Sequence, residues 1–259
     1  MARAIWKGVL RLGSISVPVK FYAAVQDRTI HLRLLERKRH EPVAQKMVDP
    51  SSGQVVPNRE IGRAYPTGDR QLVLLEPEEL EKLEPAPSRE VRLMRFVAPE
   101  RITHQWYDRP YWLGPDNSRE QYCALAEALR LADKVGVARW VMRKQEYVGA
   151  LRLEQGYLMM ITLRHRGEVI PATSLAAPPG RALEPRELAM ARQLIGAMEV
   201  EDLDLTAFHD QYRERVLELV QAKAAGKVIH FPRAPRRARE RSLVALLEKS
   251  LSSKERKSA

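Results

Sequence analysis

The sequence predicts an α+β fold in which a strand-rich part, residues 1–184, precedes a helical part. Between residues 4 and 163, short apolar runs with strand-like alternation are separated by turn signals. From residue 185 to 225 the apolar residues instead recur with helical spacing. Hydrophobic residues make up 44% of the 259 residues, as in ordinary globular domains, and the length suits one large domain or two small ones.

The N-terminal segment, residues 4–24, is typical of two strands separated by Gly13-Ser14. In the second strand the apolar residues Val17, Val19 and Phe21 alternate with other residue types, which indicates one buried face. Pro18 lies within this run. Because proline cannot donate a ladder hydrogen bond, it indicates an edge or a bulge.

Residues 28–72 are polar and contain too few large apolar residues to form a core of their own. Strand-like runs at 29–35 and 71–75 enclose the segment, and Asp49-Pro50-Ser51-Ser52-Gly53 is a strong turn signal. A compact domain seldom contains a structureless loop of this length. We therefore predict a long protruding hairpin or arm, with its tip near Ser51-Ser52-Gly53.

The middle of the chain predicts a short helix at 77–83, a longer helix, and further strands. Ser118 and Gln121 fit a capping box at the start of the longer helix, and Gly136 is a candidate for its end. The predicted strands cover 91–97, 107–113, 140–143, 147–153 and 157–163, with turns at Gln155-Gly156 and Arg166-Gly167.

The C-terminal third begins with a linker at Pro178-Pro179-Gly180. One helix is predicted from Pro185, and a second carries an apolar face from Phe208 to Val220, with Gly226 as its cap. We delimit a helical arm at 185–226 and a basic tail at 227–259. Within the tail, residues 241–251 could form a short amphipathic helix.

The net charge of +11, from 44 Lys and Arg against 33 Asp and Glu, indicates a polyanionic partner. Residues 226–259 hold ten basic and three acidic residues, so most of the excess lies in the tail. A charged tail can also serve only to keep a protein soluble. That alternative stays open on charge alone.

Several function classes find no support. No apolar run reaches the ~20 residues that span a bilayer, and the N-terminus lacks a signal peptide's apolar region, so we expect a soluble cytoplasmic protein. The single cysteine, Cys123, excludes a disulfide framework, and we expect it to be a buried small hydrophobe. The histidines lack metal-ligand spacing, and Asp202 and Asp204 suit a helix start. We expect no metal, no cofactor and no catalytic residue.

Several segments together resemble the bacterial Ku proteins of DNA double-strand-break repair, over residues 1 to about 227. They are ARAIWKG at 2–8, ISVPVKFY at 15–22, YWLGP at 111–115, the stretch 141–152 that begins with VMRKQEY, and FHDQYRE at 208–214 followed by AKAAGK at 222–227. Some members of that family carry a cysteine pair in the arm. This chain has none between 28 and 72, so a metal-stabilised arm is not expected.

The resemblance implies a non-enzymatic homodimer that binds double-stranded DNA ends. Each subunit would contribute a Ku-type β-barrel core, and the 28–72 arms would bridge the two subunits to close a ring around the duplex. The 185–226 helices would grip the partner subunit. The tail would recruit an end-joining DNA ligase of the ligase D type, and the protein would be associated with the nucleoid.

A protein that meets arbitrary broken ends should contact phosphates, which carry no sequence information. Any one basic residue could instead be only a solubilising surface charge. The candidate DNA contacts are Lys7, Arg33, Arg37, Lys38, Arg39, Lys46, Arg59, Arg63, Arg143, Lys144, Arg233, Arg236, Arg237, Arg239 and Arg241. The candidate partner contacts, on one face of the tail helix, are Leu243, Leu246, Leu247 and Leu251.

Three alternatives remain at this point. A general nucleic-acid binder would bind through the tail alone and show no preference for free ends. A nuclease would need a metal and a carboxylate cluster, which the sequence does not offer. A structural oligomer would use residues 28–72 only as a clasp.

Overall fold

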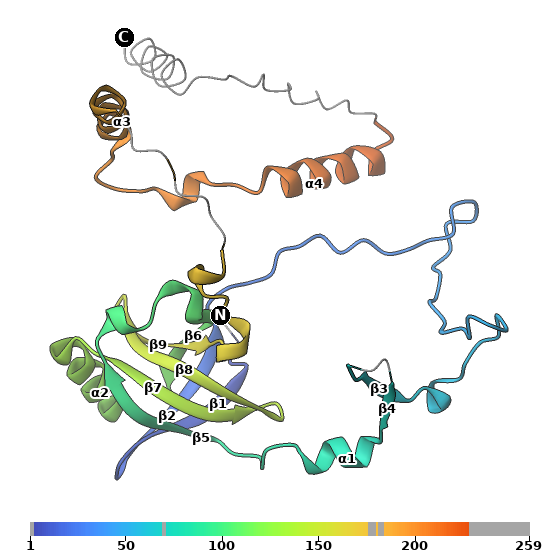
Figure 1. Ribbon diagram of the computed structural model, residues 1–259, viewed down its shortest axis with the longest axis horizontal. Helices are drawn as coiled ribbons and strands as arrows, with labels where there is room; N and C mark the ends of the chain where they lie inside the picture. Colours follow the sequence, from blue (N-terminus) through green and yellow to red (C-terminus); the bar gives the residue numbers. More distant parts are fainter. Residues whose placement is uncertain (1–2, 69–70, 176–179, 181–183, 228–259) are drawn as a thin grey trace. The chain divides into compact units, whose positions relative to one another are not determined.

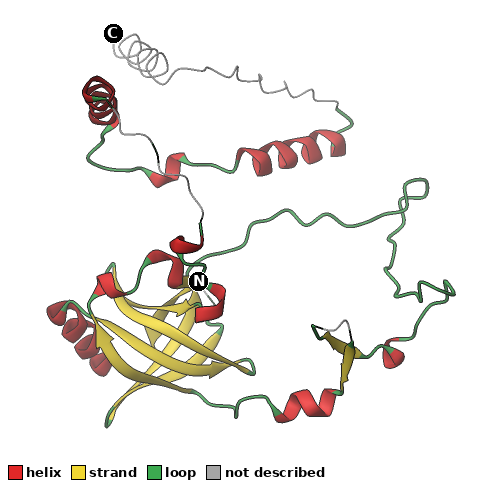
Figure 2. Ribbon diagram, in the orientation of Figure 1, coloured by secondary structure: helices red, strands yellow, loops and turns green. Residues whose placement is uncertain are grey.

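The computed structural model describes residues 3–68, 71–175, 180 and 184–227. The chain divides after Ser174 into two compact units. The first unit contains a closed β-barrel and a long insertion between two of its strands, and the second unit is helical (Figures 1 and 2). The predicted α+β class and β-barrel core are confirmed.

Seven strands close the barrel in the order β1-β2-β6-β9-β8-β7-β5, with β5 returning to β1. Neighbouring strands are antiparallel except β1 and β5, which are parallel. Figure 1 shows the strands wrapped around one another at the lower left. Their bounds are Trp6–Leu12 (β1), Ile15–Ala23 (β2), Glu90–Val97 (β5), Tyr107–Pro115 (β6), Val135–Met142 (β7), Gln145–Glu154 (β8) and Tyr157–Leu163 (β9).

The barrel interior follows from the two-residue alternation along each strand. On β2, Val17, Val19 and Phe21 are buried, while Lys20 and Tyr22 lie on the outer face and are only partly covered. Pro18 lies where the β2–β6 ladder ends: that ladder begins at Val19, and Pro18 accepts a bond from the Asp116 amide at 3.0 Å. The missing N–H of Pro18 therefore lies just beyond the end of the β2–β6 ladder, and not at a free sheet edge, because the barrel is closed.

Helix α2, Arg119–Ala132, packs its apolar face against β2 and β8. Tyr122, Leu125 and Leu129 are buried there. The Tyr122 hydroxyl donates to the Leu113 carbonyl at 2.7 Å and accepts from the Leu158 amide at 2.9 Å. It therefore joins β6 and β9 from inside, and burial raises the pKa of this phenol.

Three local predictions about this helix are wrong. Ser118 precedes α2, but its side chain makes no capping bond, because its backbone has φ −129° and ψ 59°. The helix ends at Asp133, which takes the left-handed conformation (φ 47°), and Gly136 pairs with Leu151 inside β7. Cys123 is exposed, since the buried face of α2 runs through its neighbour Tyr122.

Residues 24–89, the insertion, leave the barrel after β2 and return at β5. None of the described residues in this range is buried, as the polar composition predicts. It contains β3 (Arg63–Pro66) paired with β4 (Leu72–Leu75), then α1 (Pro77–Lys82). The carboxylate of Glu79 accepts the Glu76 amide at 2.9 Å, so two acidic residues cap the start of α1.

The predicted strand at 29–35 is absent, and the insertion is not one long hairpin. Besides the β3–β4 ladder, it holds two isolated bridges that each close a local turn, Leu35 with Pro42 and Val48 with Val55. The second bridge closes the expected turn, where the Asp49 carboxylate accepts the Ser51 amide at 2.9 Å. Neither bridge extends into a longer ladder.

Short 3₁₀ turns connect the remaining elements of the described chain. They are η1 (Asn58–Glu60), η2 (Pro99–Arg101), η3 (His104–Trp106), η4 (Arg166–Glu168), η5 (Ala172–Ser174) and η6 (Leu205–Ala207).

The second unit contains helices α3, Pro185–Met198, and α4, Gln211–Ala224. Its buried described residues are Glu187 and Ala222 alone. Gly226, with φ 69°, ends α4 as predicted, and Asp204 caps η6 by accepting the Thr206 amide at 2.9 Å. The apolar side chains of α3 and α4 therefore lie mostly exposed. The predicted tail, 228–259, lies outside the described residues.

Candidate nucleic-acid interface

Strand register brings three segments to one end of the barrel. Trp6 pairs with Phe21, so the insertion leaves β2 beside the start of β1. Strand β5 runs parallel to β1 and antiparallel to β7, so the return of the insertion and the end of β7 lie at the same end. The turn that joins β7 to β8 therefore lies beside both roots of the insertion.

This turn consists of Arg143 and Lys144, which we name the basic turn. Met142 pairs with Gln145, so the loop has two residues, and both take left-handed backbone angles, φ 53° and 65°. Two-residue hairpins of this kind favour Asn-Gly, because other residues with a Cβ are strained there by roughly 1–2 kcal/mol each. Two long cations thus occupy positions at which Asn-Gly would cost less.

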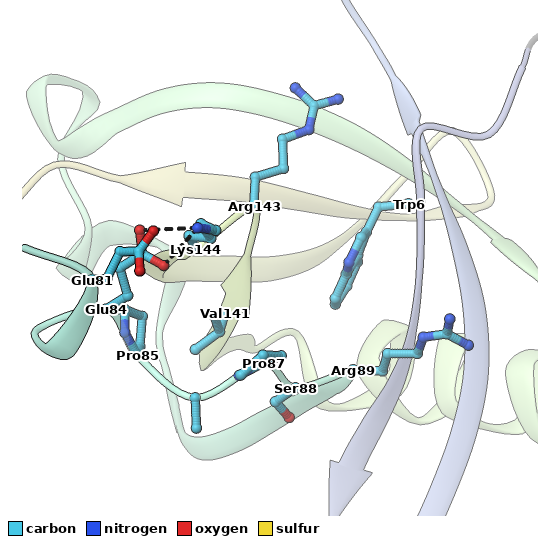
Figure 3. A pocket seen from close by; sticks show the side chains of 11 residues that line it. Trp6, Glu81, Glu84, Pro85, Pro87, Ser88, Arg89, Val141, Arg143 and Lys144 are labelled. Atoms are coloured by element: carbon cyan, nitrogen blue, oxygen red, sulfur yellow. Dashed lines mark hydrogen bonds and ion pairs between the residues drawn. The ribbon is translucent and has the colours of Figure 1, made fainter. Parts of the chain in front are cut away.

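Hollows flank the basic turn on both sides. One, with a volume of about 610 Å³, is lined by both turn residues, Trp6, Val141 and the returning segment 84–89 (Figure 3). The other hollow is lined by Arg143 and by residues where the insertion leaves the barrel, among them Ala23 and Val25. Arg143 therefore stands between the two roots of the insertion.

The two cations of the turn are in different electrostatic states. Lys144 Nζ lies 2.9 and 3.2 Å from the carboxylate oxygens of Glu84, and this ion pair raises the pKa of Lys144. Figure 3 shows Lys144 pointing toward Glu84 and Glu81, whereas Arg143 points away from them. Arg143 is exposed and makes no ion pair with any described residue. Its charge is therefore available to an anion.

Aromatic rings support the floor beneath the turn. The Trp6 ring lies edge-to-face against Phe21, with centroids 4.9 Å apart, and Trp140 stacks on Tyr147 at 5.5 Å. Gly8 and Gly149 make room for these rings, because a Cβ at Gly149 would lie 2.6 Å from the Trp140 ring. The turn is thus carried on a packed end of the barrel.

A second group of cations lies in the insertion, at a tight turn closed by Glu36. The Glu36 carboxylate accepts the amides of Lys38, at 3.0 Å, and Arg39, and its carbonyl accepts the His40 amide at 2.8 Å. Arg37, Lys38 and Arg39 form the tip of this Glu36 turn, which is separate from the turn at Ser51-Ser52-Gly53, and all three are exposed. None of them makes an ion pair with a described residue. We name these three residues the basic tip.

The other predicted contacts on the insertion are dispersed rather than gathered. Arg33, Lys46 and Arg63 are exposed, and Arg59 pairs weakly with Glu60 at 3.5 Å. Three of the predicted DNA contacts therefore lie together in the basic tip, and the other predicted contacts on the insertion lie apart from one another.

Lys7 lies elsewhere, on the outer wall of β1. It pairs with Asp116 at 3.1 Å, and Asp116 also pairs with Lys20 of β2 at 2.9 Å. The two lysines hold the pKa of Asp116 below its ordinary value, with the hydrogen bond from Lys20 as the largest cause. The predicted tail residues, from Arg233 to Arg241 and from Leu243 to Leu251, lie outside the described part.

Sequence reasoning missed Lys20, Asp116 and Glu84. It also placed Arg143 at the end of a strand, because the turn carries neither Asn nor Gly. No group of three His, Cys, Asp or Glu within the described ranges could hold a metal ion. No helix among the described residues is long and apolar enough to cross a membrane.

Comparison with known proteins gives concordant matches. A family model described as the Ku70/Ku80 beta-barrel domain matches residues 11–190. The non-homologous end joining protein Ku 3 of Saccharopolyspora erythraea is 37% identical over 221 residues, which cover 83% of each chain. The protein Ku of Coxiella burnetii is 31% identical over 98% of this chain and 96% of its own, and that of Mycobacterium tuberculosis is 31% identical over 86% and 84%.

The strain of the basic turn predicts a stabilising substitution. Arg143→Asn should raise the free energy of unfolding by about 1 kcal/mol, because asparagine tolerates left-handed angles and the change breaks no described ion pair. Chemical denaturation would measure the change. Arg101→Asn, at an exposed arginine with ordinary backbone angles, should leave stability unchanged. A destabilised Arg143→Asn protein would contradict the strain.

The lysine pair on the outer wall predicts a pH dependence. The pKa of Asp116 in the folded protein is below its ordinary value of 3.8. The contribution of this carboxylate to folding stability is therefore complete above about pH 4 and is lost as pH falls through the folded pKa. Asp116→Asn should therefore lower the melting temperature at pH 7, and the difference from wild type should shrink toward pH 3. Glu100→Gln, at an exposed carboxyl without a described ion pair, should show no such trend. A difference that stays constant with pH would refute this role.

Proposed function

The chain belongs to the Ku family, and on that premise we propose that it acts in non-homologous end joining by binding the ends of broken duplex DNA without regard to sequence. Proteins of that name are its relatives over most of their length. The proposal extends to a ring that a DNA end can thread and a closed duplex cannot.

The observation that carries the proposal is the pair of exposed cationic features on the insertion and beside its roots. The basic tip presents three side chains without described ion pairs, and Arg143 of the basic turn presents a fourth. Phosphates accept such contacts at any sequence, and each contact releases counterions. The backbone strain at Arg143 also supports a role in function, since strained positions cluster at functional sites.

Exposed apolar side chains support a homodimer. Leu32, Leu34 and Leu72 of the insertion are at least 62% exposed, and Phe208 and Tyr212 of the second unit exceed 70%. Large exposed apolar sets of this kind mark interaction surfaces. In the proposed dimer the 28–72 arms bridge the subunits, and the helices at 185–226 grip the partner.

The proposed role is that of a scaffold rather than an enzyme. The described residues offer cation surfaces and no metal-binding cluster. After threading, the protein would hold the end while an end-joining DNA ligase, recruited through the basic tail at 227–259, seals the break. It would work in the cytoplasm, on the nucleoid.

The proposal predicts a topological preference. In a gel shift at moderate salt, the protein should bind a linear duplex strongly and the same duplex as a closed circle hardly at all, because only the linear form has an end to thread. A protein that binds the side of the duplex through its tail alone should retard both forms equally. Equal retardation would refute the ring.

The basic tip predicts a change in salt dependence. Replacing Arg37, Lys38 and Arg39 together by alanine should flatten the plot of log affinity against log salt by about 0.9 for each phosphate that is no longer neutralised. A matched triple variant, Arg101→Ala, Arg119→Ala and Arg166→Ala, removes the same charge from exposed barrel-side arginines without described ion pairs. It should keep the wild-type slope. If the slope falls equally in the two variants, the tip contributes only net charge.

A further inference from the structure

Three aromatic side chains lie on the outer wall of adjacent barrel strands. Tyr22 of β2 pairs with Trp112 of β6, and Tyr157 lies at the start of β9. Their neighbours Phe21, Leu113 and Leu158 are at most 1% exposed and fill the interior. Because successive side chains in a strand point to opposite faces, the three aromatic rings must face outward.

The rings surround a hollow of about 420 Å³, which we name the aromatic hollow. Trp112 and Tyr157 meet edge-to-face with centroids 6.2 Å apart, and Tyr157 is 59% exposed. The volume of the hollow is in the ~300–1,000 Å³ range of small-ligand sites. The lining contains no charged side chain and consists of Tyr22, Ala23, Trp112, Leu113, Gly114, Gln155 and Tyr157.

Gly114 allows the hollow to exist. A Cβ at this position would lie 3.1 Å from the Tyr22 ring, closer than nine in ten real contacts. The ring of Tyr22 therefore lies across bare backbone of β6, and any side chain at 114 would displace it. The floor of the hollow is thus main chain, and aromatic rings border it.

Two lysines lie on the same outer wall, beyond the lining of the aromatic hollow. Lys20 lies two residues before Tyr22 on the same outward face, and Lys7 pairs with Lys20 across β1 and β2. Their side chains are 29% and 56% exposed, and Asp116 holds both ammonium groups. The three groups together carry one net positive charge, placed next to the rings.

We propose that the aromatic hollow binds unpaired bases of a single-stranded overhang at a DNA end, with the net positive charge of Lys7, Lys20 and Asp116 near the adjoining phosphates. Every base has a π-face, so stacking on aromatic rings tolerates any sequence. The lysines supply the charge complement that a purely apolar protein partner would not need. The proposal rests on the proposed function and gives the barrel wall a ligand distinct from duplex phosphates.

The test compares a blunt duplex with the same duplex carrying a short oligothymidylate overhang, by fluorescence anisotropy on the full chain. Wild type should bind the overhang form about tenfold more tightly, the effect of roughly one stacked base. Trp112→Leu combined with Tyr157→Ser should bind both forms equally, with blunt-end affinity unchanged. Leu131→Ser, at a 71% exposed apolar residue of α2, should keep the preference.

A second readout needs no duplex. Oligothymidylate alone should quench the tryptophan fluorescence of wild type, and Trp112→Leu should abolish most of that quenching. Should the double variant fail to fold by circular dichroism, the single Tyr157→Ser change at the exposed ring carries the comparison. It should reduce the overhang preference several-fold.

The outcomes separate this inference from the proposed function. Equal wild-type affinity for blunt and tailed duplexes, or an unchanged preference in the variants, would overturn the aromatic hollow while leaving end binding intact. Variants that bind both DNA forms normally but stimulate the ligase poorly would show a protein-docking surface and would also overturn it. Failure of wild type to bind any duplex end would refute the proposed function itself.

Discussion

The parallel pairing of β1 with β5 is the constraint on which the rest of the structure depends. It closes the barrel by joining the first strand of the chain to a strand that follows the whole insertion, through Val9 with Glu90 and Leu10 with Val91. Without this pairing the sheet would have two open edges, and the two roots of the insertion would separate. Closing so long a loop costs entropy that grows only slowly with its length, so the insertion can be long.

That closure also decides where function can be placed. Both roots of the insertion and the basic turn meet at one barrel end, on a floor of packed aromatic rings. A rigid floor allows Arg143 and Lys144 to be held in a conformation that neither residue favours, because the paired strands on each side determine it. The insertion has no buried residue of its own among those described, so its two roots tie it to the barrel.

The strands could be predicted from the sequence because alternation such as that of Val17, Val19 and Phe21 reports one buried face. Strand order and barrel closure could not, because they depend on pairings between distant segments. The lack of a core in residues 28–72 was predictable from composition. The turn at Asp49–Gly53 was predictable as well, but the Glu36 turn was not, since it depends on a single carboxylate that accepts two amides.

The candidate site was predicted only in part, for equally specific reasons. The run Arg37-Lys38-Arg39 was found because its charge is contiguous in the sequence. The strain of the basic turn was missed because residue types give no sign of φ at a turn without Asn or Gly. Lys7 was assigned to DNA without its partners, since Lys20 and Asp116 reach it only through the folded register.

The small β3–β4 ribbon has a consequence for how this protein behaves in concentrated solution. A closed barrel leaves no strand unpaired, but a two-stranded ribbon presents a free backbone edge on each side. Here the strand Leu72–Leu75 is apolar, and Leu72 and Leu74 are 72% and 56% exposed. The chain therefore carries a template for β-addition, and self-association through this ribbon, rather than loss of the barrel, should limit how concentrated its solutions can be.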